Sequence, residues 1–448
     1  MATALALFFL PPPAGIDVRV MRAAALAVFT IGFFATAVIP EFVAALSFFL
    51  LAMLFGVAPA GVVFSGFTSK ALWLVIGGLI LGIAVRSTGM GARLAGGMAR
   101  WLPNSYVGVI AGVVLIGTTF AFVMPSSLGR VVLLAPIVVL LADRLGFTAG
   151  SNGRNAVVLA MALGTWMPSN AILPANVPNM ILAGTAETLF GLSLTYGRYL
   201  LLHFPVTGVL KAVLIVIVLV VLFPDRPRSH QEDAAAMEPA SRQSHLLVFA
   251  LLVSLALWAT DFLHGISPAW VSLGAAVFCL LPPTGLVSPA DFNREFNVVS
   301  VIYVAGILGL GAMIANSGLG TLLGHALIPL LPLEPGADFR NFLTLAGFST
   351  VAGLGVTVAG EPAILGPLSA DLAQAAGLPL RTVVMIHVIG FSTVILPYQV
   401  APIVVAMQIG KVRLGPASRA TLVLMALTLL VLTPINYLWW RYLGYFGS

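Results

Sequence analysis

Long apolar runs, separated by short polar intervals, dominate the chain. Most of them are close to the ~20 residues that a helix needs to cross a hydrocarbon core, and two are roughly twice that length. The runs are 17–39, 41–59, 70–87, 105–145, 155–183, 199–223, 245–263, 268–284, 298–316, 340–377, 381–409 and 419–443. One buried core helix could imitate one such run but not this series, so the pattern predicts an all-α integral membrane protein.

Composition agrees with a membrane protein. Residues of the AVILMFWYC set make up 60% of 448 and charged residues 8%, whereas a soluble domain carries about a quarter charged residues. The net charge of +6 does not indicate nucleic-acid binding, because the basic residues are scattered between apolar runs as orientation signals. Cys279 is the single cysteine, which excludes a thiolate metal site. We expect membrane lipid as a partner, and neither nucleic acid nor a metal.

The apolar pattern occurs twice along the chain. A shift of 229 residues (306 − 77) superimposes two glycine series, namely Gly77, Gly82, Gly89 and Gly91 on Gly306, Gly311, Gly318 and Gly320. The two double-length runs also recur in the same order. We therefore predict a first repeat over residues 1–223, a cytoplasmic linker over 224–244 and a second repeat over 245–448.

The basic residues predict opposite orientations for the two repeats. The loop after 70–87 carries three arginines, whereas its counterpart after 298–316 carries no Lys or Arg before Arg340. By the positive-inside rule, matching segments then end on opposite sides of the membrane. The double-length runs 105–145 and 340–377 are expected to enter and leave on one face, as re-entrant hairpins. Inverted repeats of this kind are typical of secondary transporters, whose site lies where the halves meet.

Two apolar runs, 155–183 and 381–409, contain paired prolines near their middle. The four prolines that we expect to break these transmembrane helices are Pro174, Pro178, Pro397 and Pro402. Non-helical backbone at that depth is tolerated only where it is buried in protein or lines a wet cavity. The candidate substrate ligands beside the breaks are Asn176, Asn179 and Gln399. A proline kink that serves packing alone is the alternative.

The hairpin midpoints carry hydroxyl and charged residues. Ser126 and Ser127 align with Thr357 and Val358, and the same register places Arg130 opposite Glu361. A helix that begins at a hairpin tip favours an anion, and a guanidinium suits carboxylate geometry. We predict that a small anionic substrate is bound by the tip hydroxyls and the arginine, namely Ser126, Ser127, Thr357 and Arg130.

Glu361 is open to several roles, because ionisable groups inside a membrane are functional by default. It could bind a coupling cation together with Ser126 and Thr357, carry a proton, or form a structural bridge with Arg130. His387 fits a proton relay or a hydrogen-bonded packing role.

The alternatives to a coupled anion transporter are a cation or proton-linked carrier centred on Glu361, and an uncoupled anion exchanger or channel on the same scaffold. An enzyme is not expected, and we assign no catalytic residue. The sequence contains no H-E-x-x-H motif, and no pair of carboxylates converges in the apolar runs.

Three segments give the chain a family resemblance. They are FSGFTSKALWLVIGGLILGIAVRSTGMGARLA, VVLLAPIVVLLADRLGF and LPYQVAPIVVAMQIGKV. In these segments, and in the order of hairpin, broken helix and final span, the chain resembles the divalent anion:sodium symporters, including citrate and dicarboxylate carriers. The resemblance implies an inner-membrane homodimer with scaffold and mobile transport regions, elevator-type movement, and dicarboxylate, citrate or sulfate as substrate.

The hairpin tips depart from that family. Its Ser-Asn-Thr pattern, which helps to bind sodium and substrate, reads Ser126-Ser127-Leu128 in the first hairpin and Thr357-Val358-Ala359 in the second. Both asparagines are therefore absent. Either Na⁺ or H⁺ is expected as the coupling ion, with no other cofactor. Arg130 could supply the positive charge that sodium would otherwise bring.

Overall fold

The structure is a computed structural model that describes residues 2–13, 16–36, 38–90, 93, 105–124, 126–227, 241–355, 358 and 360–447. These residues form helices joined by loops, and the described chain contains no strand. The predicted all-α class is confirmed. Most of the predicted linker, residues 228–240, lies outside the described residues.

Helices of the first half begin where caps and prolines place them. They are α1 (Ala2–Phe9), α2 (Val18–Thr36), α3 (Glu41–Leu54), α4 (Ala60–Val63), α5 (Ser65–Thr68), α6 (Lys70–Ser87), α8 (Tyr106–Val123), α9 (Ser127–Arg144), α10 (Asn152–Trp166), η1 (Pro168–Ala171), η2 (Leu173–Ala175), α11 (Val177–Phe190), α12 (Tyr196–His203), η3 (Phe204–Leu210) and α13 (Lys211–Leu222). Ser69 caps α6 by accepting the N–H of Ala71, and Ser105 caps α8 through Gly108.

Helices of the second half follow a similar order. They are α14 (Arg242–Ala259), α15 (Asp261–His264), α16 (Pro268–Leu280), α17 (Pro289–Glu295), α18 (Val298–Asn316), α19 (Leu319–Leu327), η4 (Ile328–Leu330), α20 (Asp338–Gly355), α21 (Glu361–Leu365), η5 (Gly366–Leu368), α22 (Ser369–Ala376), α23 (Leu380–Ser392), η6 (Pro397–Gln399), α24 (Ala401–Gly410), α25 (Leu414–Leu427), η7 (Thr428–Leu432) and α26 (Thr433–Tyr442). The long helix that ends each half contains a π-helical segment, η3 or η7.

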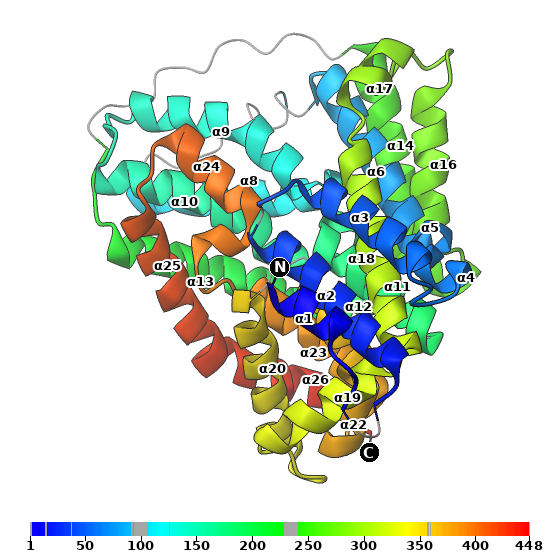
Figure 1. The fold of residues 1–448 in the computed structure, drawn as a ribbon. Coiled ribbons are helices and arrows are strands. Elements are labelled where there is room, and N and C mark those ends of the chain that lie inside the picture. The colour runs from blue at the N-terminus through cyan, green and yellow to red at the C-terminus, as the bar shows by residue number, and fades with distance from the viewer. Residues whose placement is uncertain are drawn as a thin grey trace.

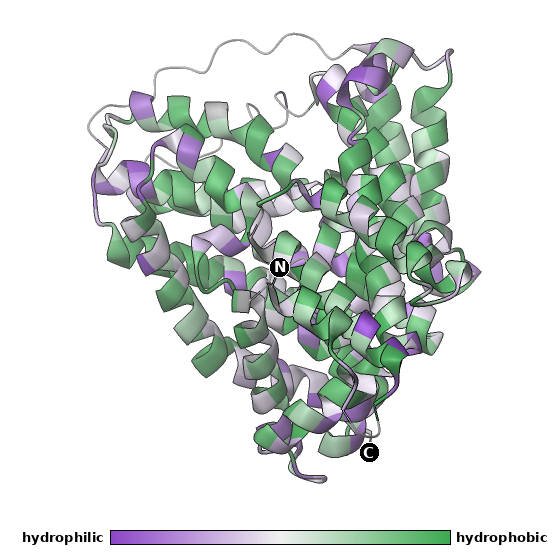
Figure 2. Cartoon of the chain, viewed as in Figure 1, coloured by the Kyte–Doolittle hydropathy of each residue, from purple (hydrophilic) through white to green (hydrophobic). Residues whose placement is uncertain are grey.

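Six helices within the described residues are long and apolar enough to cross a membrane. They are Lys70–Ser87, Tyr106–Val123, Tyr196–Leu222, Arg242–Ala259, Val298–Asn316 and Leu414–Tyr442. Large apolar side chains are exposed along them, for example Leu115, Ile217 and Leu430, and Figure 2 shows apolar residues over most of the helical surface. The predicted multi-pass membrane protein is therefore confirmed, since such a surface requires lipid around it.

Upright helices on one side of the molecule, α6, α14, α16 and α18, form a bundle together with α3 (Figure 1). Small residues let the helices approach closely across the halves. A Cβ on Gly77 of α6 would lie 2.4 Å from Ser272 Oγ of α16, and one on Gly306 of α18 would lie 2.6 Å from Ala45 Cβ of α3. Each half therefore places its glycine against a helix of the other half.

Two pairs of glycines, 229 residues (318 − 89) and 231 residues (377 − 146) apart, also share a backbone conformation. Gly89 and Gly318 have φ of +66° and +80°, and Gly146 and Gly377 have φ of +74° and +65°. Such angles favour glycine, so the same turns explain the same residues in both halves. These pairs support the two-repeat prediction. The inverted orientation and the repeat boundaries stay predictions.

The double-length runs fold into helical arms that meet at a tip. In the first half, α8 and α9 are joined at Met124–Ser126. In the second half, α20 is followed by α21, η5 and α22, and the chain then bends by 120° into α23. The return arm is interrupted at η5, which contains Pro367, because a proline inside a helix removes a hydrogen bond. Pro362 occupies the second position of α21, where the missing N–H is tolerated. Whether these arms re-enter the membrane from one face stays a prediction.

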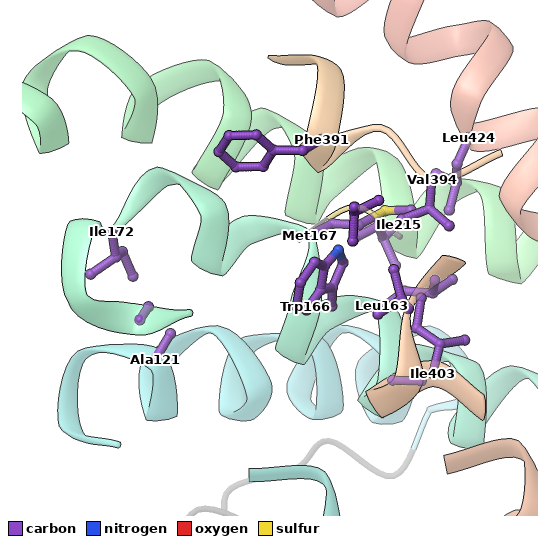
Figure 3. Close-up of a cluster of buried hydrophobic side chains, with 14 of the residues drawn as sticks. Ala121, Leu163, Trp166, Met167, Ile172, Ile215, Phe391, Val394, Ile403 and Leu424 are labelled. Carbon is purple, nitrogen blue, oxygen red and sulfur yellow. The ribbon is translucent and has the colours of Figure 1, made fainter. Parts of the chain in front are cut away.

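An apolar core fixes the ends of the two broken helices relative to each other. Figure 3 shows Trp166 and Met167, at the end of α10, close to Val394, Ile403 and Leu424 from the second half. All five side chains are buried in one hydrophobic cluster. Because interiors are close-packed, this contact holds the breaks of both halves next to each other.

Candidate functional site

Both proline-containing runs are interrupted at the prolines. The helix α10 ends at Trp166, two short 3₁₀ turns follow, and α11 begins at Val177. In the second half, α23 ends at Ser392, and α24 begins at Ala401 after the turn η6. Pro174 lies in η2 and Pro397 opens η6. Pro178 and Pro402 each occupy the second position of the following helix, where the missing N–H is tolerated.

Side chains satisfy backbone carbonyls that the breaks release. The hydroxyl of Tyr199 donates to the carbonyl of Asn170 at 2.8 Å. That carbonyl would otherwise bond position 174, where Pro174 has no N–H. The hydroxyl of Thr118 donates to the carbonyl of Gly164 at 3.3 Å. The first break is therefore stabilised by neighbouring helices and is not a simple kink.

Asn176 and Asn179 are buried within the same break. The Asn176 side chain caps α11 by accepting the N–H of Asn179 at 3.4 Å, and its Nδ2 donates to Asn170 Oδ1 at 2.9 Å. Asn179 Nδ2 donates to the carbonyl of Ile172 at 2.8 Å. Both amides thus shape the unwound backbone, and neither lines the cavity described below. Their contact with substrate stays a prediction.

Gln399 ties the second break to the tip of the second hairpin. Its Oε1 accepts the N–H groups of Ile395 and Leu396 at 2.8 Å each, and its Nε2 donates to the carbonyl of Gly353 at 2.6 Å. The carbonyl of Gln399 accepts the N–H of Val358 at 3.4 Å. Thr357, the predicted tip hydroxyl beside it, lies outside the described residues.

Arg130 is fully buried behind the tip of the first hairpin. Its guanidinium donates to four oxygen atoms: the carbonyls of Met124, Ala175 (2.9 Å) and Thr165 (3.1 Å) and the hydroxyl of Ser127 (2.9 Å). The salt bridges within the described residues do not include Arg130. The guanidinium therefore places a positive charge next to the tip without a neutralising carboxylate.

Glu361 is equally buried but has different partners. Its Oε1 accepts a hydrogen bond from the Ser349 hydroxyl and lies 3.2 Å from His387 Nδ1. The other ring nitrogen of His387 is 3.0 Å from Ser369 Oγ. Glu361 Oε2 has no hydrogen-bond partner among the residues that the structure describes. Arg130 and Glu361 form no bridge in this structure, and each belongs to a separate polar network.

A cavity of about 370 Å³ lies between the bundle and the two tips. Ser126, Ser127, Pro178, Gln399 and Pro402 of the predicted site line it, together with Phe34, Glu41, Val75, Leu79, Leu128, Trp166, Val177, Met180, Asn297, Ser300, Tyr303, Leu354, Val358, Tyr398, Val400 and Ala401. Arg130 lies one hydrogen bond behind Ser127. The cavity is large enough for a small dianion, and its wall contains both breaks.

Several helices point their N-termini at this cavity. Lining residues include the first residues of α3, α9, α11 and α24, and Asn297 caps α18. A helix N-terminus carries partial positive charge and free N–H groups. These ends, with Arg130 behind Ser127, offer N–H donors and positive charge to an anion, whereas Glu41 places one carboxyl group in the same wall.

Residues that the sequence interpretation did not select include Glu41, Trp166 and Tyr303. The indole N–H of Trp166 is buried in the cavity wall and makes no hydrogen bond within the described chain. Since an indole nitrogen only donates, it is a further candidate donor to an anion. Trp166 lies two residues before Pro168 inside the apolar run 155–183, a signal that could have identified it. Glu41 and Tyr303 reach the cavity only through the packing of α3 and α18.

Comparison with known proteins identifies a family and several proteins that this chain resembles. The family described as the sodium:sulfate symporter transmembrane region matches residues 1–446. A protein of Cupriavidus necator named as a membrane protein is 24% identical over 88% of this chain and 81% of its own length. The chloroplastic dicarboxylate transporter 2 of Spinacia oleracea is 24% identical over 58% of this chain, and that match spans about half (48%) of the spinach protein.

The fold also resembles that of a solved transporter. The crystal structure of the Alcanivorax borkumensis YdaH transporter, which has an unusual topology, superimposes with a TM-score of 0.57. The two chains are 15% identical, and the match covers 89% of this chain and 90% of the other. At that identity the likeness supports the fold alone.

Proposed function

Because the chain belongs to the sodium:sulfate symporter family, we propose that it carries a small dianion of the dicarboxylate, citrate or sulfate class across the membrane. Family membership makes it a multi-pass membrane carrier and not an enzyme, and an inner-membrane location agrees with its apolar helices. The dicarboxylate class is supported by the name of the spinach relative.

The observation that carries this proposal is the unpaired charge of Arg130. A buried cation without a carboxylate partner is unstable unless polar groups or a bound anion compensate it. The guanidinium donates to Ser127, and Ser127 lines the cavity. An anion bound at Ser126, Ser127 and the Trp166 N–H would complete the electrostatic balance. This reading disfavours a cation carrier at the same cavity.

The proposed route of transport is elevator-type alternating access in a homodimer. The cavity wall is shared between the bundle of α3, α6 and α18 and the broken helices with their hairpin tips. Movement of the tips against the bundle would transfer the cavity from one side to the other, as inverted-repeat carriers do. Hydrogen bonds at the tips, such as the one from Gln399 to the carbonyl of Gly353, would hold the broken helix and the hairpin together during that step.

Glu361 is the proposed coupling group, with a proton as its ion. The carboxylate lies in a buried chain of Ser349, His387 and Ser369, which resembles a proton-carrying network more than a cation site. One proton could be shared between the carboxylate and the imidazole.

The deciding experiment is uptake of a labelled dicarboxylate into proteoliposomes, under an imposed proton gradient and separately under a sodium gradient. Accumulation above the outside concentration under the proton gradient is expected, with competition by unlabelled citrate or sulfate. No uptake of any of these dianions under either gradient would refute the proposed function. Exchange without accumulation would favour the uncoupled exchanger.

A coupling role for Glu361 can be tested by comparing proton-driven accumulation with substrate exchange. We expect Glu361→Gln to lose accumulation driven by protons, while exchange of internal for external substrate continues, because the amide cannot take up and release the proton. Asp371→Asn, which removes a nearby acid of α22 outside the network, should accumulate substrate like the wild type. Proton-driven accumulation by Glu361→Gln would exclude this carboxylate as the coupling group.

A further inference from the structure

We infer that a pocket between α12, α23 and the C-terminal segment 443–447 binds the headgroup of an anionic phospholipid. The pocket has a volume of about 420 Å³. Its wall includes Arg198 and Leu201 of α12, Arg381 of α23 and Tyr445 of the C-terminal segment. It shares no lining residue with the cavity between the bundle and the two tips, so the inference does not depend on the proposed function.

Two arginines give this pocket its charge. Arg198 is exposed, and Arg381 is half-buried with its guanidinium carbon 5.9 Å from the centre of the Tyr445 ring. The salt bridges within the described residues include neither arginine. No Asp or Glu is among the described residues that line the pocket. Both guanidinium groups are therefore available to phosphate oxygens, which a guanidinium binds through two parallel N–H groups.

Helix stability does not explain where these arginines lie. Arg198 is the third residue of α12, and Arg381 is the second residue of α23. The first turn of a helix is the positive end of its dipole, which disfavours a cation. A bound anion would offset that effect at both positions.

The pocket lies at the depth of the lipid headgroups. Arg198 lies at the start of the span Tyr196–Leu222, and the C-terminal segment follows the end of the span Leu414–Tyr442. Near that end, the indole N–H of Trp439 donates to the carbonyl of Leu201 at 3.0 Å and joins the two spans beside the pocket. Tryptophan is enriched where a membrane meets water. Basic pockets between membrane-spanning helices at this depth bind the headgroups of anionic lipids.

An apolar stripe that faces the lipid begins at the same pocket. Leu201 lines the pocket and is 53% exposed, and exposed side chains continue along the span at Val209, Val213, Ile217 and Val221. Steps of four or eight residues place these side chains on one face of the helix. A phospholipid whose phosphate contacts the arginines would lay an acyl chain along this stripe, whereas a free anion would contact the arginines alone. The stripe is the reason for assigning a lipid.

The adjoining pocket is less suited to an anion. It has a volume of about 630 Å³ and contains Arg340 and Arg441, but Asp338 also lines it. Arg340 already forms a salt bridge with Glu334. We therefore place the headgroup in the first pocket.

The experiment is thermal unfolding of the purified full-length protein in detergent, with dioctanoyl phosphatidylglycerol, dioctanoyl phosphatidylcholine or inorganic phosphate added. We expect phosphatidylglycerol to raise the unfolding temperature more than phosphatidylcholine, whose net charge is zero. In Arg198→Gln/Arg381→Gln, the affinity for phosphatidylglycerol deduced from this rise should fall roughly thirtyfold, because two arginines no longer attract the headgroup.

Arg413→Gln/Arg419→Gln is the matched control. It removes the same charge from two exposed arginines at the start of α25, which lie outside both pockets. This variant should respond to phosphatidylglycerol like the wild type.

Equal responses of the wild type to the two lipids, or an unchanged phosphatidylglycerol response in Arg198→Gln/Arg381→Gln, would overturn the inference. A rise with inorganic phosphate that equals the rise with phosphatidylglycerol, and is lost in this variant, would overturn it in favour of a free-anion site. Should this variant not fold, Arg198→Gln decides the question, because Arg198 is exposed and an unchanged response would refute the site. Since unfolding needs no transport, absence of dianion uptake would refute only the proposed function.

Discussion

Some buried polar side chains in this protein form hydrogen bonds with backbone groups, and others line the cavity. Asn176 and Asn179 were predicted as substrate ligands, and in the structure they bond the unwound segment. Sequence could identify that polar groups accompany the proline breaks, because the breaks require them. It could not assign each amide to a carbonyl or to the cavity, because that depends on the direction of the side chain in the folded chain.

Lys211 illustrates the cost of a buried charge. The residue opens α13, is 1% exposed, and its Nζ has no hydrogen bond or ion pair within the described residues. Replacement by an apolar residue of similar length removes that penalty. We expect Lys211→Met to raise the free energy of unfolding by about 1 kcal/mol or more, measured by thermal unfolding in detergent, with normal uptake.

Lys70→Met provides the control for that measurement. Lys70 lies 2.5 Å from Glu187, and its side chain is 42% exposed. Loss of such a partly solvated pair should change stability by less than about 1 kcal/mol. A folded Lys211→Met protein that no longer transports would show that this lysine serves the transport cycle.

At the scale of helices, local signals predicted the boundaries well. The predicted runs 70–87 and 298–316 coincide with α6 and α18. Caps and prolines act within one turn, so they can be read from sequence. The return arm of the second hairpin was expected as part of one double-length run, yet it is divided into α21, η5 and α22. There the apolar character concealed the effect of Pro367.

Close approach of α3 and α18 depends on the absence of a side chain at Gly306. Its Cβ position would be 2.6 Å from Ala45 Cβ, so a larger residue must separate the two helices. We expect Gly306→Leu to lower the free energy of unfolding by about 1–3 kcal/mol, measured by thermal unfolding. Gly77→Leu should behave alike, because Gly77 makes the equivalent contact with Ser272.

Gly274→Ala on α16 is the matched control for this packing argument. A Cβ at Gly274 would meet nothing within 4 Å. Its stability should stay the same or rise by up to about 1 kcal/mol, because alanine favours the helix. Wild-type stability of Gly306→Leu would mean that α3 and α18 are not packed as the structure shows.

For the whole molecule, the sequence predicted that the two halves build one site. The cavity draws its wall from both halves, and its role as the site stays a prediction. The two-repeat prediction rests on glycines and prolines that recur at nearly fixed spacing. Glu41 and Tyr303 could not be found in that way. They come from helices that carry no break, and only the packing of the bundle brings them to the cavity.

Alternating access predicts that the cavity is reachable from each side in turn. Leu128 lines the cavity and is 42% exposed. In a Cys279→Ser background, Leu128→Cys should react with an impermeant thiol reagent added to either side, and substrate should slow the reaction. Ala149→Cys, exposed in the loop between α9 and α10 and outside the cavity, should react at a rate that substrate does not change. Labelling from one side only, under every condition, would contradict alternating access.

The separation of Arg130 from Glu361 has an electrical consequence. Within the proposed moving region, the fixed positive charge and the ionised carboxylate cancel when the carrier is empty. A dianion taken up with one proton leaves one negative charge, which an inside-negative membrane opposes by about 2.3 kcal/mol per 100 mV. The membrane voltage would then change the rate at which the loaded carrier crosses the membrane, but not the rate at which the empty carrier returns. Rapid voltage steps should therefore evoke transient currents only when substrate is present.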